Sequence, residues 1–307
     1  MDILAIGEPM MEFSEIRDPH RGNIYLPGLG GDTSNFAVAA SRQGAKVGYF
    51  TRLGQDVFGD RFMELWQHEG IDTKLVIRDP KAPTGIYFVT HTDQGHQFTY
   101  YRKGSAASLL NAYEISESMI KGTKLLHVSG ISQAISESSC DAINRAIHIA
   151  RSNGVMVSYD ANLRLKLWPL AQAKAVIENS AVLSDVFMPS YEDAEQLTGL
   201  QDEDQIVDHY LQMGVKRIAL KLGKRGVLVA TFDERHRIDG FQVNSVDATG
   251  AGDTFDGAFL SQMLKGVSMP EAARYANAAA AISTTGYGAV APIPDQETVE
   301  AFLMKQQ

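Results

Sequence analysis

The sequence predicts an α/β protein in which a mostly parallel β-sheet is covered by helices on both faces. Short β-branched or apolar runs alternate with longer stretches of helical periodicity, as is typical of parallel strands joined by helical crossovers. The chain has 307 residues, of which 44% are hydrophobic and 21% are charged, so it can bury one large core or a core plus a small appendage. A single hairpin pattern interrupts the alternation. Because no flexible linker divides the chain, we expect one domain over residues 1–307.

The strands are predicted by short runs rich in Val, Ile and Leu, and the helices by apolar residues that recur with the helical period. Strands and helices follow one another along most of the chain, which is the order that builds a parallel sheet. The predicted strands are residues 3–6, 47–53, 125–129, 155–160, 186–188, 217–222 and 227–231. The predicted helices are residues 58–69, 138–152, 171–180, 192–197, 205–213, 254–264 and 270–284.

Residues 84–103 predict a β-hairpin, in which two extended runs flank a turn-forming segment at residues 92–95. Because strand side chains alternate between faces, Tyr100 and Arg102 point the same way, and Tyr87 can join them from the partner strand. Two interpretations stay open. This face covers a polar ligand, or the hairpin is a solvated edge whose aromatic residues pack on the core.

The charge balance excludes some classes of partner. The formal net charge is -9 and the isoelectric point is near 5.4, so neither nucleic acid nor an anionic membrane surface is an expected partner. The single cysteine, Cys140, cannot form an internal disulfide, which indicates a reducing compartment. The first residues carry no basic segment and no long apolar run, so we expect a cytoplasmic protein.

The segment at residues 247–259 carries the clearest chemical signal. Gly250, Ala251 and Gly252 run directly into a predicted helix, so the backbone can approach a ligand and the free amides at the helix start face it. Such amides suit the charge on a phosphoryl group in transfer. Asp253 at the mouth of this helix is our candidate general base. Alternatively, it only stabilises the helix dipole.

Two segments carry a resemblance to a known family. Residues 247–259 resemble the C-terminal signature of the ribokinase-like carbohydrate kinases, and residues 30–39 are similar to the N-terminal signature. The signatures occur in the family's order, and the resemblance covers essentially the whole chain. It implies a three-layer αβα core with a mostly parallel sheet, and a small β-sheet lid formed roughly by residues 12–33 and 84–108.

The resemblance also implies an activity. Members of the family transfer the γ-phosphate of ATP to a hydroxyl of a small sugar, with Mg²⁺ and in some cases a monovalent cation. The likeness places the sugar against Gly31, Asp32 and Asn35 and makes Asp253 the residue that takes the hydroxyl's proton. The predicted hairpin at residues 84–103 lies where the family's lid belongs, which favours its role as a cover.

Within the family the chain looks most like the 2-keto-3-deoxygluconate kinases, so the expected acceptor is a sugar acid. Guanidinium groups and phenolic hydroxyls hold a carboxylate well, and Arg102, Arg164 and Tyr100 would supply them beside Tyr87. Arg164 follows the end of a predicted strand and could also touch the phosphate. Alternatively, both arginines are solvated surface charges. The segments that carry this likeness are residues 31–35, 85–87, 100–106, 160–164 and 167–168.

The family resemblance places ATP along the C-terminal half of the chain, where no Walker A loop is present. Relatives organise Mg²⁺ through water with an Asn-x-x-Glu motif, whereas this chain has Ser190 and Asp193 at those positions. Asp193 is the expected metal contact, with Glu192 or Glu195 as alternatives. The expected nucleotide contacts are Asn162, Ser190, Lys221, Gly223, Gly226, Thr249, Gly250 and Gly252.

Other functions stay open at this point. A kinase for fructose, ribose or a nucleoside would share both signatures. A sugar-binding regulator that has lost transfer would share the fold, although the intact segment 250–253 opposes this interpretation. A dehydrogenase is disfavoured, because no G-x-G-x-x-G motif follows the first strand. The family likeness also leads us to expect a homo-oligomer, a dimer or larger.

Overall fold

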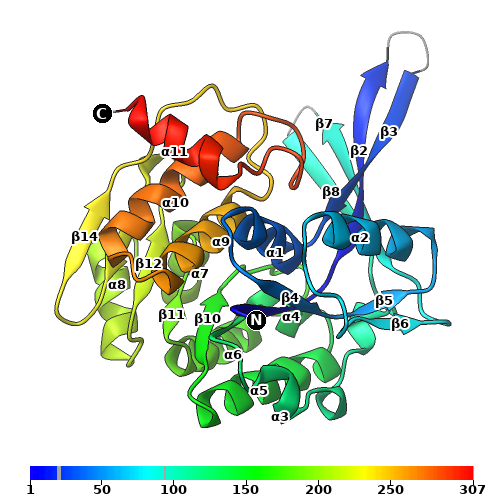
Figure 1. Cartoon of the computed structure of the whole chain (residues 1–307), viewed down its shortest axis with the longest axis horizontal. Coiled ribbons are helices and arrows are strands. Elements are labelled where there is room, and N and C mark those ends of the chain that lie inside the picture. The colour runs from blue at the N-terminus through cyan, green and yellow to red at the C-terminus, as the bar shows by residue number, and fades with distance from the viewer. Residues whose placement is uncertain (19–21, 93–94, 307) are drawn as a thin grey trace.

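Within residues 1–18, 22–92 and 95–306, which the computed structural model describes, eight strands form the main sheet. They are β1 (Ile3–Ile6), β4 (Val47–Phe50), β9 (Leu125–Ser129), β10 (Met156–Asp160), β11 (Val186–Phe187), β12 (Ile218–Lys221), β13 (Val227–Ala230) and β14 (Arg235–Ile238). Their spatial order is β14-β13-β12-β11-β10-β9-β1-β4 (Figure 1). From β12 to β4 all neighbours are parallel, whereas β13 and β14 pair antiparallel.

Helices cover both faces of this sheet. They are α1 (Asp32–Arg42), α2 (Val57–His68), α3 (Glu117–Ile120), α4 (Gly130–Ala134), α5 (Glu137–Ser152), α6 (Leu170–Leu183), α7 (Tyr191–Thr198), α8 (Glu203–Gln212), α9 (Ala251–Leu264), α10 (Met269–Ser283) and α11 (Gln296–Met304). Short 3₁₀ turns are η1 (Ala107–Leu109), η2 (Ala112–Glu114) and η3 (Gly223–Arg225).

Alternate residues of a strand pack into two separate hydrophobic cores, one on each face of the sheet. The sheet and the helices on its two faces therefore form three layers. Leu4 and Ile6 of β1 pack with α5, α6, α7 and α8 on one face. Ile3 and Ala5 of the same strand pack with α1, α2, α9, α10 and α11 on the other face. A strand whose side chains are buried on both faces needs helices on both sides. The predicted αβα core with a mostly parallel sheet is therefore confirmed.

A second sheet of four strands projects from this body (Figure 1). Its strands are β2 (Met10–Asp18), β3 (Gly22–Gly30), β7 (Gly85–Thr92) and β8 (Gly95–Tyr101), in the order β3-β2-β7-β8. β7 and β8 form the predicted hairpin, and Tyr87 lies directly opposite Tyr100. Residues 93–94 of its predicted turn and residues 19–21 of the expected lid lie outside the described residues.

The prediction of one strand at residues 47–53 is wrong, because the chain changes sheets there. β4 pairs with β1, whereas β5 (Arg52–Gly54) pairs in parallel with β6 (Ile77–Asp79). Thr51 lies between the two strands, and its carbonyl accepts a hydrogen bond from the Ile77 amide at 2.9 Å. The short strands therefore belong to different sheets.

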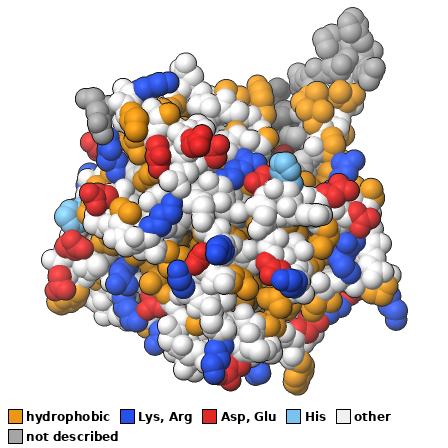
Figure 2. Space-filling model, viewed as in Figure 1, with side chains coloured by type: hydrophobic (Ala, Val, Ile, Leu, Met, Phe, Trp, Pro, Cys, Tyr) orange, Lys and Arg blue, Asp and Glu red, His pale blue; other side chains and the backbone are white. Residues whose placement is uncertain are grey.

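The visible surface carries charged side chains of both signs. On the face shown in Figure 2, positive and negative side chains are interspersed, and hydrophobic side chains gather where the second sheet projects. Among the described residues, no helix combines the length and the apolar character that crossing a membrane requires.

Candidate active site

The N-terminus of α9 forms a tight backbone turn at the predicted phosphate site. Gly250 precedes the helix in the left-handed region with φ 76°, which favours glycine. A side chain at this position would begin 2.9 Å from the Ala289 carbonyl oxygen. The Ala251 amide donates to the Ala248 carbonyl at 3.2 Å. The first amides of a helix lack partners within it, so those of Gly252 and Asp253 can donate to an anion.

Asp253 is the third residue of α9 and is half-buried. Its Oδ2 accepts a hydrogen bond of 2.8 Å from Asn35 Nδ2 on α1. Burial, and after it the charge of Asp32, raises the pKa of Asp253 to about 7, although the hydrogen bond from Asn35 opposes this rise. A carboxylate that titrates near neutral pH can accept a proton from a hydroxyl.

The start of α1 brings two further polar groups to this site. Gly31 has φ 104°, and a side chain there would begin 2.3 Å from the Glu8 carbonyl oxygen. Asp32 Oδ2 accepts from Asn162 Nδ2 at 3.2 Å, and burial raises the pKa of Asp32. In the described part of the chain, Asp32 Oδ1 and Asn35 Oδ1 are buried without a hydrogen-bond partner.

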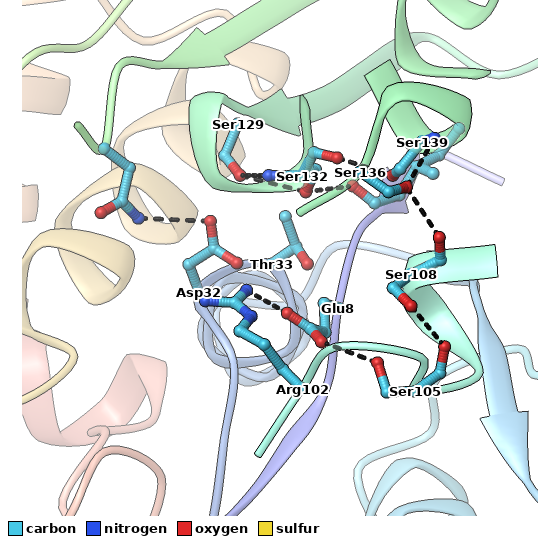
Figure 3. Close-up of polar contacts among 12 residues, drawn as sticks. Glu8, Asp32, Thr33, Arg102, Ser105, Ser108, Ser129, Ser132, Ser136 and Ser139 are labelled. Atoms are coloured by element: carbon cyan, nitrogen blue, oxygen red, sulfur yellow. Dashed lines mark hydrogen bonds and ion pairs between the residues drawn. The ribbon is translucent and has the colours of Figure 1, made fainter. Parts of the chain in front are cut away.

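Side chains of the second sheet lie at the same site. The guanidinium of Arg102 lies 5.6 Å from the centre of the Tyr100 ring and forms a buried ion pair with Glu8 (Figure 3). Tyr87 donates its hydroxyl hydrogen to Glu12 Oε2. Arg102 therefore lies beside Tyr87 and Tyr100 as expected, but it is not a solvated charge, since its side chain is 9% exposed.

Glu8 and Glu12 are two buried carboxylates that sequence reasoning missed. Glu8 follows β1 at the carboxyl edge of the parallel sheet, where ligands bind in α/β proteins, and this position could have marked it. Glu12 lies on β2, which was not predicted as a strand, so no periodicity indicated the direction of its side chain.

The end of β10 presents Asn162 and Arg164. Asn162 adopts φ 35°, which an asparagine tolerates better than most residues. Arg164 is exposed, and its Nη1 donates to the Leu163 carbonyl at 2.8 Å. Burial raises the pKa of Tyr100, while the charges of Arg164 and Arg102 lower it. Both arginines are therefore close enough to act on the same phenol.

Lys221, at the end of β12, was expected to contact ATP. Its Nζ lies 3.1 Å from Asp160 Oδ1 and 3.0 Å from Asp256 Oδ2. Burial opposes the charged form, but the two carboxylates outweigh it and raise the pKa of Lys221. A side chain on Gly252 would begin 3.6 Å from this Nζ, so the ammonium lies next to the α9 N-terminus.

The remaining predicted nucleotide and metal contacts lie at the start of α7 and in the turns before α9 and after β12. Ser190 caps α7 and accepts from the amide of Asp193 at 3.0 Å. Burial, followed by the charge of Asp160, raises the pKa of Asp193 to about 6. Thr249 donates its amide and its hydroxyl hydrogen to Asp247, at 2.9 and 2.7 Å, in the turn before α9. Gly223 and Gly226 shape the η3 turn between β12 and β13.

Comparison with known proteins gives one family and several relatives. A family model described as pfkB family carbohydrate kinase matches residues 1–296. A 2-dehydro-3-deoxygluconokinase of Bacillus subtilis (strain 168) is 34% identical, with 100% of this chain and 97% of the relative covered. The one from Thermoproteus tenax is 32% identical, with 99% and 94% covered. Fructokinase-1 of Zea mays is 34% identical, with 92% and 90% covered.

Solved structures show the same fold. A protein assigned as ribokinase II from E. coli, solved with ATP and Mg²⁺, superposes with a TM-score of 0.91 at 27% identity. A fructokinase from Vibrio cholerae O395, solved with fructose, ADP and a calcium ion, has a TM-score of 0.88 at 30% identity. Each match covers 99% of this chain and 99% of the other.

Proposed function

Because the chain belongs to the pfkB family of carbohydrate kinases, we propose that it transfers the γ-phosphate of ATP to 2-keto-3-deoxygluconate and forms the 6-phosphate. The family makes it a phosphotransferase with an alcohol group as acceptor. This acid is also named 2-dehydro-3-deoxygluconate. Relatives named for it and relatives named for fructose have similar identities, so the residues of this chain must decide between the two acceptors.

The observation that supports the acid is the buried guanidinium of Arg102, which lies 5.6 Å from the centre of the Tyr100 ring. Arg102 and Arg164 both act on the pKa of Tyr100, although they come from different parts of the chain. A carboxylate gains most from paired planar donors and a hydroxyl, whereas a neutral ketose has no charge to match them. Fructose is the second candidate, because relatives named for it align along nearly the whole chain.

Buried polar atoms without partners support a ligand with several hydroxyls. Within the described residues, Asp32 Oδ1, Asn35 Oδ1 and Arg102 Nε have no hydrogen-bond partner. Leaving a buried polar group unpaired costs roughly 1–3 kcal/mol, so such atoms are expected where a ligand completes them. Two acceptors and one donor suit the hydroxyl and carbonyl groups of an open-chain sugar acid.

The transfer step follows from the position of Asp253. With its pKa near 7, the carboxylate is about half ionised at neutral pH and mostly ionised above it, and the ionised form can take the proton of the attacking hydroxyl. Asn35 holds Oδ2 of this carboxylate at 2.8 Å and orients it. The free amides at the start of α9, with the Lys221 ammonium beside them, balance the charge on the transferred group.

The residues present fit a magnesium nucleotide. Mg²⁺ prefers carboxylate oxygens and water, and Asp193 offers a carboxylate in the first turn of α7, where its amide donates to Ser190 Oγ. Asp193 would hold the ion through water, and the α9 amides would hold the phosphates. When bound, ATP supplies the phosphoryl group and Mg²⁺ neutralises part of its charge.

Steady-state kinetics with the acid and with fructose test this proposal. Arg164→Ala should raise KM for the acid by about tenfold and leave KM for fructose nearly unchanged, since a hydrogen bond to a charged group contributes about 1.5–3 kcal/mol. Arg151→Ala is the matched control, because Arg151 also donates to a backbone carbonyl, that of Leu183.

Three outcomes would contradict the proposal. Equal losses on both acceptors would remove the carboxylate clamp. Faster turnover of fructose than of the acid by the natural protein would make fructose the substrate. Binding of the acid without any turnover would indicate a regulator rather than an enzyme.

A further inference from the structure

A chain of polar contacts runs from Arg102 through Glu8 to Ser105 and Ser108 (Figure 3). Its Nη2 pairs with Glu8 Oε2, and the Ser105 hydroxyl donates to Glu8 Oε1 at 3.2 Å. Ser108 in turn donates to the Ser105 carbonyl at 2.7 Å. The Glu8 side chain is 0% exposed. A fully buried carboxylate with two partners has one position, and it fixes the groups that bind to it.

The surrounding backbone leaves room for this carboxylate. A side chain on Gly85 would begin 3.1 Å from Glu8 Oε1, which is tighter than ordinary contact. Gly85 starts β7 and Arg102 follows β8, so Glu8 lies against both ends of the β7–β8 hairpin. With Nη2 on Glu8, Arg102 Nε stays without a partner in the described chain.

We propose that Glu8 is a positioning residue for the acceptor: it holds Arg102 Nη2 so that the unpartnered Nε is left for the sugar acid. This inference rests on the proposed function, in which Arg102 contacts the acceptor. Glu8 itself does not touch the acceptor. Its contribution comes from the length of its side chain, which sets where the guanidinium lies over the Tyr100 ring.

Two substitutions separate placement from charge. Glu8→Gln keeps the length and one acceptor oxygen for Nη2 but removes the charge, whereas Glu8→Asp keeps the charge and withdraws it by one methylene. We expect Glu8→Gln to stay within about threefold of the natural KM for the acid. Glu8→Asp should raise that KM by about tenfold, since it breaks a charged hydrogen bond. Neither variant should change KM for ATP.

Glu69→Asp is the matched control, because Glu69 forms an ion pair of 2.7 Å with Arg42. It should lower the thermal midpoint without changing either KM. In an Arg102→Ala background, Glu8→Asp should add nothing to the loss. If the Glu8 variants do not fold, Ser105→Ala should raise KM for the acid by a few fold. Ser184→Ala, which removes a buried hydroxyl that donates to the Ala181 carbonyl at 2.7 Å, should leave that KM unchanged.

The results that overturn the inference are distinct from those that overturn the proposed function. A raised KM for the acid in Glu8→Gln with an unchanged KM in Glu8→Asp would show that Glu8 acts through its charge rather than through the placement of Arg102. Two harmless Glu8 variants beside a damaging Arg102→Ala would show that Arg102 acts without Glu8. A harmless Arg102→Ala would instead remove the clamp on which both proposals stand.

Discussion

At the scale of single residues, Asp253 combines features that two distant segments supply. Asn35 contacts it from α1, 218 positions away in the sequence, and Asp32 raises its pKa from the same helix. The two signatures predicted both segments, but neither could show that Asn35 binds Asp253 directly. Separate motifs give residue types and order, whereas the contact depends on how closely α1 and α9 pack.

The pKa of Asp253 predicts the pH dependence of the reaction. Burial favours the neutral acid, so the ionised fraction grows as pH rises through about 7. We expect kcat/KM for the acid to increase with a midpoint near this value and then to level off, because only the carboxylate accepts a proton. Affinity for ATP, measured at each pH, is the control. A flat profile between about pH 5 and 9 would exclude Asp253 as the base.

The buried pair of Glu8 and Arg102 shows what sequence could not give at this scale. Strand alternation predicted the direction of Arg102, and this prediction needed only the hairpin. Its partner is 94 positions away and comes from the loop after β1. A glutamate in a loop is usually solvated, so its identity alone does not indicate burial.

At the scale of elements, the core strands and helices followed from their patterns because each is buried against a neighbour. β2 and β3 were not predicted from their own patterns, since β2 carries Glu12 and Glu15 and β3 carries Pro27, residues that disfavour strands. Only the family resemblance, which implied a β-sheet lid over roughly residues 12–33, indicated them. Their pairing with β7 and with each other compensates. β14 was missed for a similar reason: Arg235 on this edge strand forms ion pairs with Asp204 and Asp208 of α8.

The close approach of α1 and α9 depends on Gly257. A side chain there would begin 2.7 Å from Ala39 Cβ and 2.9 Å from the Phe36 carbonyl oxygen. Gly257→Ala should therefore separate the helices, lower the free energy of unfolding by about 1–3 kcal/mol, and raise KM for the acceptor by moving Asn35 away from Asp253.

Chemical denaturation and steady-state kinetics measure the two effects of Gly257→Ala. Gly28→Ala is the control, because a side chain at that position would begin 3.5 Å from Glu12 Cβ, an ordinary contact. A stable Gly257→Ala protein with an unchanged acceptor KM would show that helix spacing does not set the geometry of the base.

At the scale of the whole molecule, the site lies where the second sheet meets the carboxyl edge of the main sheet. Sequence reasoning predicted both sheets, because a hairpin in an α/β chain has no place in a parallel sheet. It could not predict the register of β2 with β7, which brings Glu12 opposite Tyr87. The expected association of copies into a homo-oligomer stays a prediction.

If Asp253 is the general base, its substitution should stop phosphoryl transfer without weakening the binding of ATP or of the acid. Asp253→Asn keeps the size of the side chain and removes its ability to accept the proton. Calorimetry should give Kd values for ATP and for the acid within about threefold of the natural protein, while turnover falls roughly 10²–10⁴-fold. Near-normal turnover with both ligands still bound would contradict the central claim.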